Sequence, residues 1–262
     1  MIRALYTAAS GMNAQQVNID NVAHNLANVN TVGFKKSRVE FEDLVYQQSK
    51  APGSPTSSTG EAPVGLEMGL GVRSVASARD FGRGNMRATS SPLDMAVEGD
   101  GLFQVTLPSG EAAYSRSGTF HLSAEGSLVT SEGYPMQPQI TIPAGAMSIT
   151  ISKGGIVSAT ISGQTAAQEI GTIELASFRN PAGLLSLGGN LFQATTASGD
   201  ATVGAPGVDG RGTVAQGYLE DSNVSVVEEM VTMILSQRAY EANSKVVKAS
   251  DEMLQQVNSL VR

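Results

Sequence analysis

The two ends of the chain carry residues at regular intervals of seven, and the middle does not. Near the N-terminus the interval is kept by Leu5, Met12, Ile19 and Leu26, with a companion set three residues earlier at Ile2, Ala9, Gln16 and Ala23. Near the C-terminus it is kept by Val226, Met233, Tyr240, Val247, Leu254 and Val261. This spacing is typical of helices that supercoil around partner helices. We therefore expect two terminal helices whose seam residues make subunit contacts.

The first helix is expected over residues 3–29, and its polar positions are mostly amides rather than charges. A helix with one face in water usually carries Lys, Glu and Arg there. Amides can hydrogen-bond neighbouring elements without the desolvation cost of a charge. We therefore expect this helix to be surrounded by neighbours. Gly33 suits a left-handed residue at the end of the helix.

The middle of the chain changes to a period of two. From 91 to 202 short runs of Val, Ile, Leu, Phe and Tyr alternate with polar residues and are separated by Gly- or Pro-containing turns. Many short strands with frequent turn signals are typical of an all-β domain. The predicted fold class is α+β: paired N- and C-terminal coiled-coil helices with an inserted, mostly antiparallel β domain and an extended linker region.

Three regions follow from these patterns. We expect a terminal helical core at 1–32 and 222–262, an extended linker or β region at 33–90 and 203–221, and an outer β domain at 91–202. Residues 34–46 do not decide between extended and helical structure. The stretch 49–63 is rich in Ser, Thr, Pro and Gly, which fits a flexible linker. Leu66 to Val72 predicts a short strand.

Composition excludes several classes of function. The chain has no cysteine, so disulfides and thiolate chemistry are excluded. The net charge is −7, which is opposite to the basic footprint that nucleic-acid binding requires. No run reaches the ~18 apolar residues of a membrane span. The N-terminus has the pattern of an amphipathic helix and predicts no cleaved signal peptide.

Catalytic, metal and cofactor sites are not expected. Neither His24 nor His121 has a second histidine near it that would complete a local metal set. No serine lies in a nucleophile elbow, and the isolated Gly-x-Gly pairs lack the setting of a nucleotide-binding turn. The sequence therefore favours a protein built for assembly rather than an enzyme.

Two stretches of the sequence indicate a particular protein family more specifically than the patterns above. Residues 23–35, which read AHNLANVNTVGFK, resemble the N-terminal signature of the bacterial flagellar axial proteins, the family of rod, hook and hook-associated proteins. The matching positions are Asn25, Leu26, Ala27, Asn28, Thr31, Gly33, Phe34 and Lys35. Ser222-Asn223-Val224 and Glu229-Met230 resemble the C-terminal signature of this family, together with Gln237, Arg238, Ala239, Tyr240 and Glu241. The likeness continues through residues 99–105 and 114–120.

Within this family, residues 46–72 resemble the insertion of the distal-rod members. In those members the insertion is understood to lock neighbouring subunits into a straight, stiff tube, so the resemblance argues against a free linker at 49–63. Another axial member, of proximal-rod or hook type, is the alternative. Residues 54–61 differ in detail from relatives.

The resemblance implies a structural subunit that polymerises into a rigid, hollow drive shaft, transmits torque from motor to hook and conducts exported subunits. The implied partners are other copies of the chain, the proximal rod proteins, the hook protein, and the ring proteins of the peptidoglycan and outer membrane. The implied location is the basal body from periplasm to outer membrane, reached by type III export.

Two rivals come from other classes. An envelope enzyme such as a peptidoglycan hydrolase would need an added carboxylate-bearing domain, and residues 91–202 show no such constellation. A free adhesin-like β protein would have no reason to carry both terminal signatures.

Overall fold

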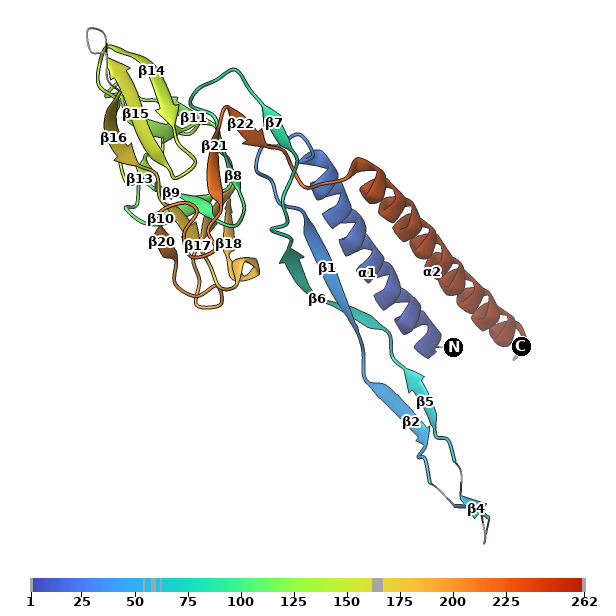
Figure 1. Ribbon diagram of the computed structural model, residues 1–262. Coiled ribbons are helices and arrows are strands. Elements are labelled where there is room, and N and C mark those ends of the chain that lie inside the picture. The colour runs from blue at the N-terminus through green and yellow to red at the C-terminus, as the bar shows by residue number, and fades with distance from the viewer. Residues whose placement is uncertain (1, 54, 58–59, 62, 162–166, 261–262) are drawn as a thin grey trace. The chain divides into compact units, whose positions relative to one another are not determined.

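The computed structural model describes residues 2–53, 55–57, 60–61, 63–161 and 167–260. The described chain contains a long helix at each end and short strands between them (Figure 1). The helices are α1 (Ile2–Ala27) and α2 (Val226–Leu260). This confirms an α+β fold with helical termini. The predicted seam residue Val261 lies outside the described residues, and Ile2 is described only as part of the α1 backbone.

The chain divides into two compact units. The first contains 1–27, 37–78 and 225–262, and the second contains 28–36 and 79–224. Compared with the regions expected from the sequence, this division assigns 37–78 to the helical unit and 203–224 to the β unit.

In the first unit α1 and α2 run side by side in opposite directions, with both chain ends at the same end of the pair (Figure 1). Asn18 Nδ2 donates to Ser236 Oγ at 2.8 Å, and Asn25 Nδ2 donates to Glu229 Oε2 at 3.4 Å. A Cβ on Gly11 would lie 2.8 Å from Asn243 Nδ2. Each step of seven along α1 is therefore matched by a step of seven back along α2.

The remainder of the first unit consists of strand pairs. β1 (Ser37–Asp43) pairs with β6 (Val72–Arg79), and β2 (Tyr46–Lys50) pairs with β5 (Leu66–Gly69). β3 (Pro55–Ser57) pairs with β4 (Gly60–Glu61). The β2–β5 register places Gln48 opposite Glu67, and their side chains hydrogen-bond at 2.8 Å. In the stretch expected as either a linker or an insertion, the described residues therefore include paired β-strands, and a structureless linker is the wrong interpretation for them.

The second unit is built on an antiparallel sheet with the strand order β18-β19-β10-β9-β17-β20, and β13 also pairs with β9. Its strands are β9 (Leu102–Thr106), β10 (Ala112–Ser115), β13 (Met136–Gln137), β17 (Leu175–Ser177), β18 (Leu185–Gly188), β19 (Leu191–Gln193) and β20 (Thr202–Gly204). A second sheet joins β14 (Ala146–Ile151), β15 (Ile156–Ile161) and β16 (Gln168–Thr172).

Three further pairs complete the second unit: β11 (Phe120–Leu122) with β12 (Leu128–Thr130), β8 (Met95–Glu98) with β21 (Thr213–Gln216), and β7 (Met86–Ala88) with β22 (Tyr218–Glu220). The chain also forms a short 3-10 helix at Pro181–Gly183. The prediction of many short antiparallel strands in the middle of the chain is confirmed.

Both faces of the central sheet are buried at β9. Phe103 and Val105 enter the main core, where Phe103 meets Phe120 edge to face at 5.3 Å between ring centroids. Leu102 points to the other face and packs in a smaller cluster with Phe192. Successive side chains of a strand point to opposite faces, so two adjacent buried residues require cover on both sides. Burial of a side chain such as Phe103 contributes about 1.5–3 kcal/mol.

Candidate functional site

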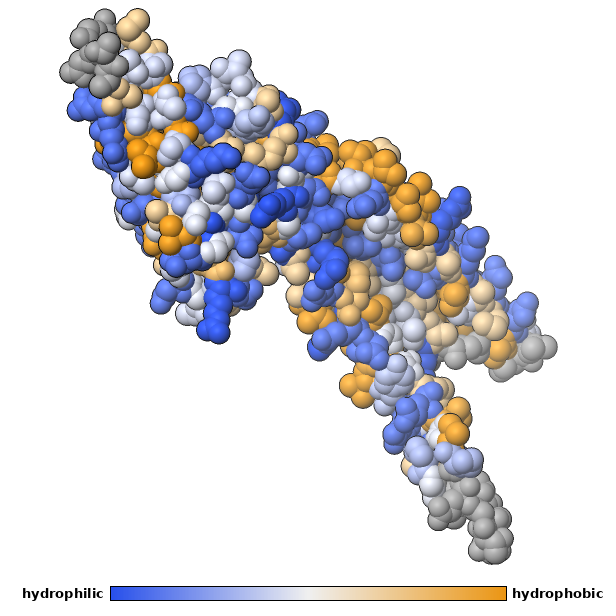
Figure 2. All heavy atoms as spheres, viewed as in Figure 1, coloured by the Kyte–Doolittle hydropathy of each residue, from blue (hydrophilic) through white to orange (hydrophobic). Residues whose placement is uncertain are grey.

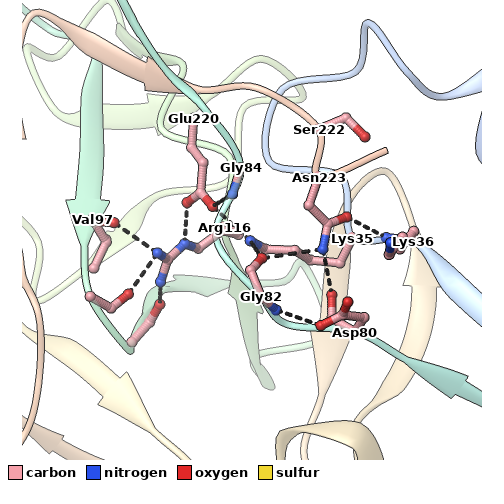
Figure 3. A network of polar contacts seen from close by, with 12 residues as sticks. Lys35, Lys36, Asp80, Gly82, Gly84, Val97, Arg116, Glu220, Ser222 and Asn223 are labelled. Carbon is pink, nitrogen blue, oxygen red and sulfur yellow. Dashed lines mark hydrogen bonds and ion pairs between the residues drawn. The ribbon is translucent and has the colours of Figure 1, made fainter. Parts of the chain in front are cut away.

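A buried ionic network lies where three distant stretches of the second unit meet (Figure 3). Lys35 is the last residue of the N-terminal signature, Arg116 lies after β10, and Glu220 ends β22. Their exposed fractions are 1%, 4% and 2%. Charged residues are rarely this buried unless they are paired.

Glu220 is the centre of this network. Its Oε1 accepts from Lys35 Nζ at 2.7 Å and from the Gly84 N–H at 2.8 Å. Its Oε2 accepts from Arg116 Nε at 2.5 Å. Burial alone would raise the pKa of the Glu220 carboxyl, but Arg116, Lys35 and the Gly84 N–H together lower it. The carboxylate is therefore held in its charged form.

The two cations also bond to backbone carbonyls. Lys35 Nζ donates to Gly82 O at 2.7 Å. The Arg116 Nη2 donates to Val97 O and Gly99 O at 2.7 Å each, and Nη1 donates to Gly101 O. Burial lowers the pKa of Lys35 despite the opposing effect of Glu220. One carboxylate thus faces two cations, and carbonyl dipoles solvate the remaining positive charge.

Asn223 of the C-terminal signature ties the flanking backbone together. Its Oδ1 accepts from the Lys36 N–H at 2.7 Å, and its Nδ2 donates to Asp80 O at 2.9 Å (Figure 3). The N–H of Gly33 donates to Glu220 O at 2.8 Å. The segments that lead out of α1 and into α2 are therefore fixed to one another beside the network.

Glycines permit the close approach of these segments. Gly33 has φ +71°, and a Cβ there would lie 2.5 Å from the Ser117 N. Its left-handed conformation is confirmed, but α1 already ends at Ala27, so Gly33 does not cap the helix. A Cβ on Gly118 would lie 1.4 Å from Met95 O. Only glycine fits at either position.

Other residues of the N-terminal signature have local structural roles. Asn25 is 1% exposed; its Nδ2 donates to Ser37 O at 2.9 Å and its Oδ1 accepts from the Ser37 N–H at 3.0 Å. Thr31 Oγ1 donates to Asn28 Oδ1 at 3.2 Å. Phe34 is buried under the Arg79 guanidinium, Leu26 is half-buried and Ala27 is exposed. The amide-rich face of α1 therefore binds both α2 and the start of β1.

The predicted seam is only partly covered within one chain. Its half-buried members are Leu5, Met12, Ile19, Leu26, Met233, Val247 and Leu254. Val226 and Tyr240 remain 37% and 39% exposed. The companion residues Ala9, Gln16 and Ala23 are exposed, whereas Ala8 and Val22, three residues after seam positions, are buried. A helix with a single helical neighbour buries only one stripe of its surface. On α1 the buried stripe runs beside the seam through Ala8 and Val22, on the side away from the exposed companion residues Ala9 and Ala23.

The C-terminal signature lies mostly at the surface of α2. Gln237, Arg238 and Glu241 are exposed, and Ala239 is half-buried. Arg238 pairs with Glu241 at 3.1 Å on the exposed face, a contact of small energetic value. These residues make no contact within the described chain that explains a shared motif.

Sequence reasoning missed two sets of residues. Glu220 precedes the C-terminal signature by two positions, but nothing in the sequence pairs it with Lys35 and Arg116.

The second set is an exposed apolar group at the start of α2, called the α2 patch, which consists of Val227, Met230, Val231, Ile234 and Leu235. Figure 2 shows this hydrophobic surface along the upper part of α2. Its members follow the i, i+3, i+4, i+7, i+8 spacing of one helix face, but the interval of seven that begins at Val226 passes beside them.

The described residues offer no candidate metal site. Among the described residues, no three His, Asp or Glu side chains gather in a way that would hold a metal ion. His121 Nε2 lies 3.4 Å from Ser131 Oγ at the surface, and His24 is exposed. No described helix is long and apolar enough to cross a membrane.

Comparisons with known sequences identify the class of protein. The profile described as "Flagella basal body rod protein" matches residues 5–35, and "Flagellar hook protein FlgE/F/G D1 domain" matches 96–159. "Flagellar basal body rod FlgEFG protein C-terminal" matches 215–260. Helical termini around a β unit, with signatures on both, therefore define a flagellar axial protein.

Full-length relatives give the particular family. The flagellar basal-body rod protein FlgG of Borreliella burgdorferi is 50% identical over 264 residues, covering all of both chains. FlgG of Caulobacter vibrioides is 48% identical over 99% of both chains, and FlgG of Bacillus subtilis is 39% identical over the whole of both. The chain belongs to the flagellar basal-body rod protein family, a family of structural rod subunits.

Proposed function

We propose that this chain is the subunit of the distal part of the flagellar rod, and that it polymerises into a straight, rigid, hollow shaft that carries torque from motor to hook and conducts exported subunits. The full-length similarity to FlgG supports this assignment. The observation that carries it is the apolar surface left uncovered on α2, where Ile234 is 56% and Leu235 is 64% exposed.

That surface favours assembly for a physical reason. The α2 patch on α2 and the half-covered seam on α1 and α2 together leave large apolar side chains exposed or half-exposed, and such surfaces mark sites of protein association. Burying each of these side chains against a neighbour contributes about 1.5–3 kcal/mol. In the assembled shaft α1 and α2 are proposed to supercoil with the helices of adjacent copies.

The proposed function also implies particular partner proteins and a particular location in the cell envelope. The proximal rod proteins, the hook protein and the rings in the peptidoglycan and outer membrane are the proposed contacts, and the location is the basal body from periplasm to outer membrane. The chain is proposed to arrive by type III export and to have no catalytic activity.

The proposal is tested by Leu254→Asp and Leu26→Asp. Both side chains are half-buried seam positions. A carboxylate buried against a neighbouring helix costs several kcal/mol, so we expect loss of polymerisation and motility. Electron microscopy of purified protein and of isolated hook–basal bodies gives the measurement.

Gln256→Asp is the matched control, because Gln256 is an exposed residue one half-turn from Leu254. It introduces the same charge on the same helix, and we expect normal rods. The tyrosine circular dichroism of the β unit should be unchanged in all three variants. Straight rods and normal swimming in both leucine variants would refute the seam assignment.

A further inference from the structure

The second unit contains a cavity of about 450 Å³ beside the ionic network. Its apolar wall is formed by Phe81, Leu102, Phe178 and Pro181. Phe178 stacks edge to face on Tyr114 at 4.8 Å between ring centroids, and Phe81 packs on Phe192 at 5.3 Å. Rings held by such contacts make a preformed wall, and a cavity of this size with a few polar groups is typical of a binding site.

The polar side of the cavity is positively charged. Lys35, Arg116 and Arg179 line it, and Asp100 is the one acid among the lining residues. Glu220 is already bonded to Lys35 and Arg116. Counting Glu220, three cations face two carboxylates, and Arg179 is exposed with no ion pair among the described residues.

The two buried cations, Lys35 and Arg116, each have an N–H donor for which the described residues provide no acceptor. An ammonium has three N–H donors and a guanidinium has five. Among the described residues, Lys35 Nζ donates only to Glu220 and Gly82. Arg116 donates to Glu220 and to three carbonyls, which leaves one N–H. Two spare donors on nearly inaccessible cations at a cavity wall match the two oxygens of a carboxylate.

We propose that this cavity receives a carboxylate side chain of a second copy of the chain in the assembled shaft, with Arg179 closing over it. This inference rests on the proposed function. A second copy is the favoured occupant because the chain carries 24 acidic against 17 basic residues and therefore presents mostly acids to its neighbours. A helical homopolymer brings a different face of each copy against the cavity of the next.

The first test is charge reversal. Arg179→Glu places a like charge against the incoming carboxylate, and we expect the critical concentration for polymerisation to rise by at least about 10-fold, because unfavourable charge contacts at an interface cost more than one factor of ten. Lys153→Glu is the control, with the same charge change on an exposed turn of the same unit. It should polymerise like the unaltered chain.

The second test identifies the occupant. Arg179→Lys keeps the positive charge and supplies an amine for zero-length carbodiimide coupling. In polymers mixed from ¹⁴N and ¹⁵N protein, we expect mass spectrometry to find position 179 joined to an Asp or Glu peptide of the other isotope. Coupling within one copy only, or none, would overturn the proposal.

The two proposals fail in distinguishable ways. If the unaltered chain does not form rods, the proposed function is wrong. If it does and Arg179→Glu polymerises at the same concentration, the cavity makes no such contact. Tight binding of free acetate to the monomer, with polymerisation unchanged in the variant, would instead assign the cavity to a small carboxylate.

Discussion

Glu220 holds together residues that the chain places far apart. Lys35 and Arg116 lie 185 and 104 positions away from it, and both reach its carboxylate within 2.7 Å. A buried ion pair adds little stability compared with apolar packing, but removing one member leaves uncompensated charge. The value of Glu220 therefore lies in fixing how the chain leaves α1 and enters α2.

Glu220→Gln should destabilise the β unit by about 3–5 kcal/mol, because two buried cations then lose their counter-charge. Asp221→Asn is the control: Asp221 is the next residue and pairs with Arg87 at 3.1 Å at the surface. Loss of that pair should cost at most about 1 kcal/mol. Urea unfolding followed by tyrosine fluorescence measures both. Equal losses in the two variants would contradict a buried network.

The stability difference between the unaltered chain and Glu220→Gln should depend on pH. The pKa of Glu220 is lowered in the folded chain. The stabilisation is then complete above the unfolded pKa of about 4.3 and is lost as pH falls through the folded pKa. We expect a constant difference from about pH 7 to pH 5 and convergence of the two proteins at lower pH. A difference that vanishes while pH is still above about 5 would mean that the carboxyl is not held charged.

At the scale of elements, polar layers set the pairing of the two helices. Gly11, Asn18 and Asn25 face Asn243, Ser236 and Glu229 in turn, at positions between the apolar residues of the seam. Small and amide side chains allow the helix backbones to approach and bond only in one register, as polar residues do in other helix pairs. Gly11 lowers helix propensity by about 1 kcal/mol, and its contact with Asn243 gives the reason for its presence.

The β2–β5 hairpin is an element that needs neighbours. All residues of both strands are exposed, with Tyr46 at 52% and Leu66 at 57%. An isolated two-stranded hairpin is marginally stable in water. This hairpin is therefore expected to be ordered by adjacent subunits in the shaft.

Replacing residues 49–63 by a shorter Gly-Ser linker should soften or curve the rod without preventing secretion, because flexible residues do not keep the strand pairing rigid. The measurement is the curvature of isolated rods in electron micrographs. The control adds two glycines at Gly110, in a turn where a side chain would meet no atom within 4 Å. Rods that stay equally straight after the replacement would return this segment to a linker without mechanical role.

At the scale of the whole molecule, the helical unit and the β unit differ in how completely their apolar side chains are buried within one chain. The β unit buries its core residues almost fully, with Phe103, Leu175 and Ile173 at 0% exposure. The helical unit leaves Val227 at 73% and Val231 at 52%. One unit therefore buries its core within a single chain, whereas the other leaves large apolar side chains exposed, and we expect neighbouring subunits to cover them.

Amide exchange should show this difference. In the monomer we expect weak protection across α1 and α2, because most helix stability comes from packing an apolar face, and strong protection in the core of the β unit. Polymerisation should protect the helices by a large factor and change the β core little. Strong protection of both helices in a demonstrably monomeric sample would show that the helices need no neighbours.

The order of residues was sufficient to predict which regions are helical and which are built of strands. The seven-residue intervals predicted both helices and the period of two predicted the β unit, because burial of one face imposes a repeat that is visible in the order of residues. The two signatures were sufficient to identify the family. These patterns involve residues close together in the chain, so helices and strands can be predicted from them without knowledge of the tertiary fold.

The contacts between residues far apart in the chain could be read only from the folded structure. Nothing in the local sequence pairs Lys35 and Arg116 with Glu220, places Asn18 against Ser236, or pairs β2 with β5. The folded structure also shows that the buried residues beside the seam are Ala8 and Val22, whereas Ala9 and Ala23 are exposed. Such contacts depend on the path of the chain between them, and a buried charge shows its partner only once that path is fixed.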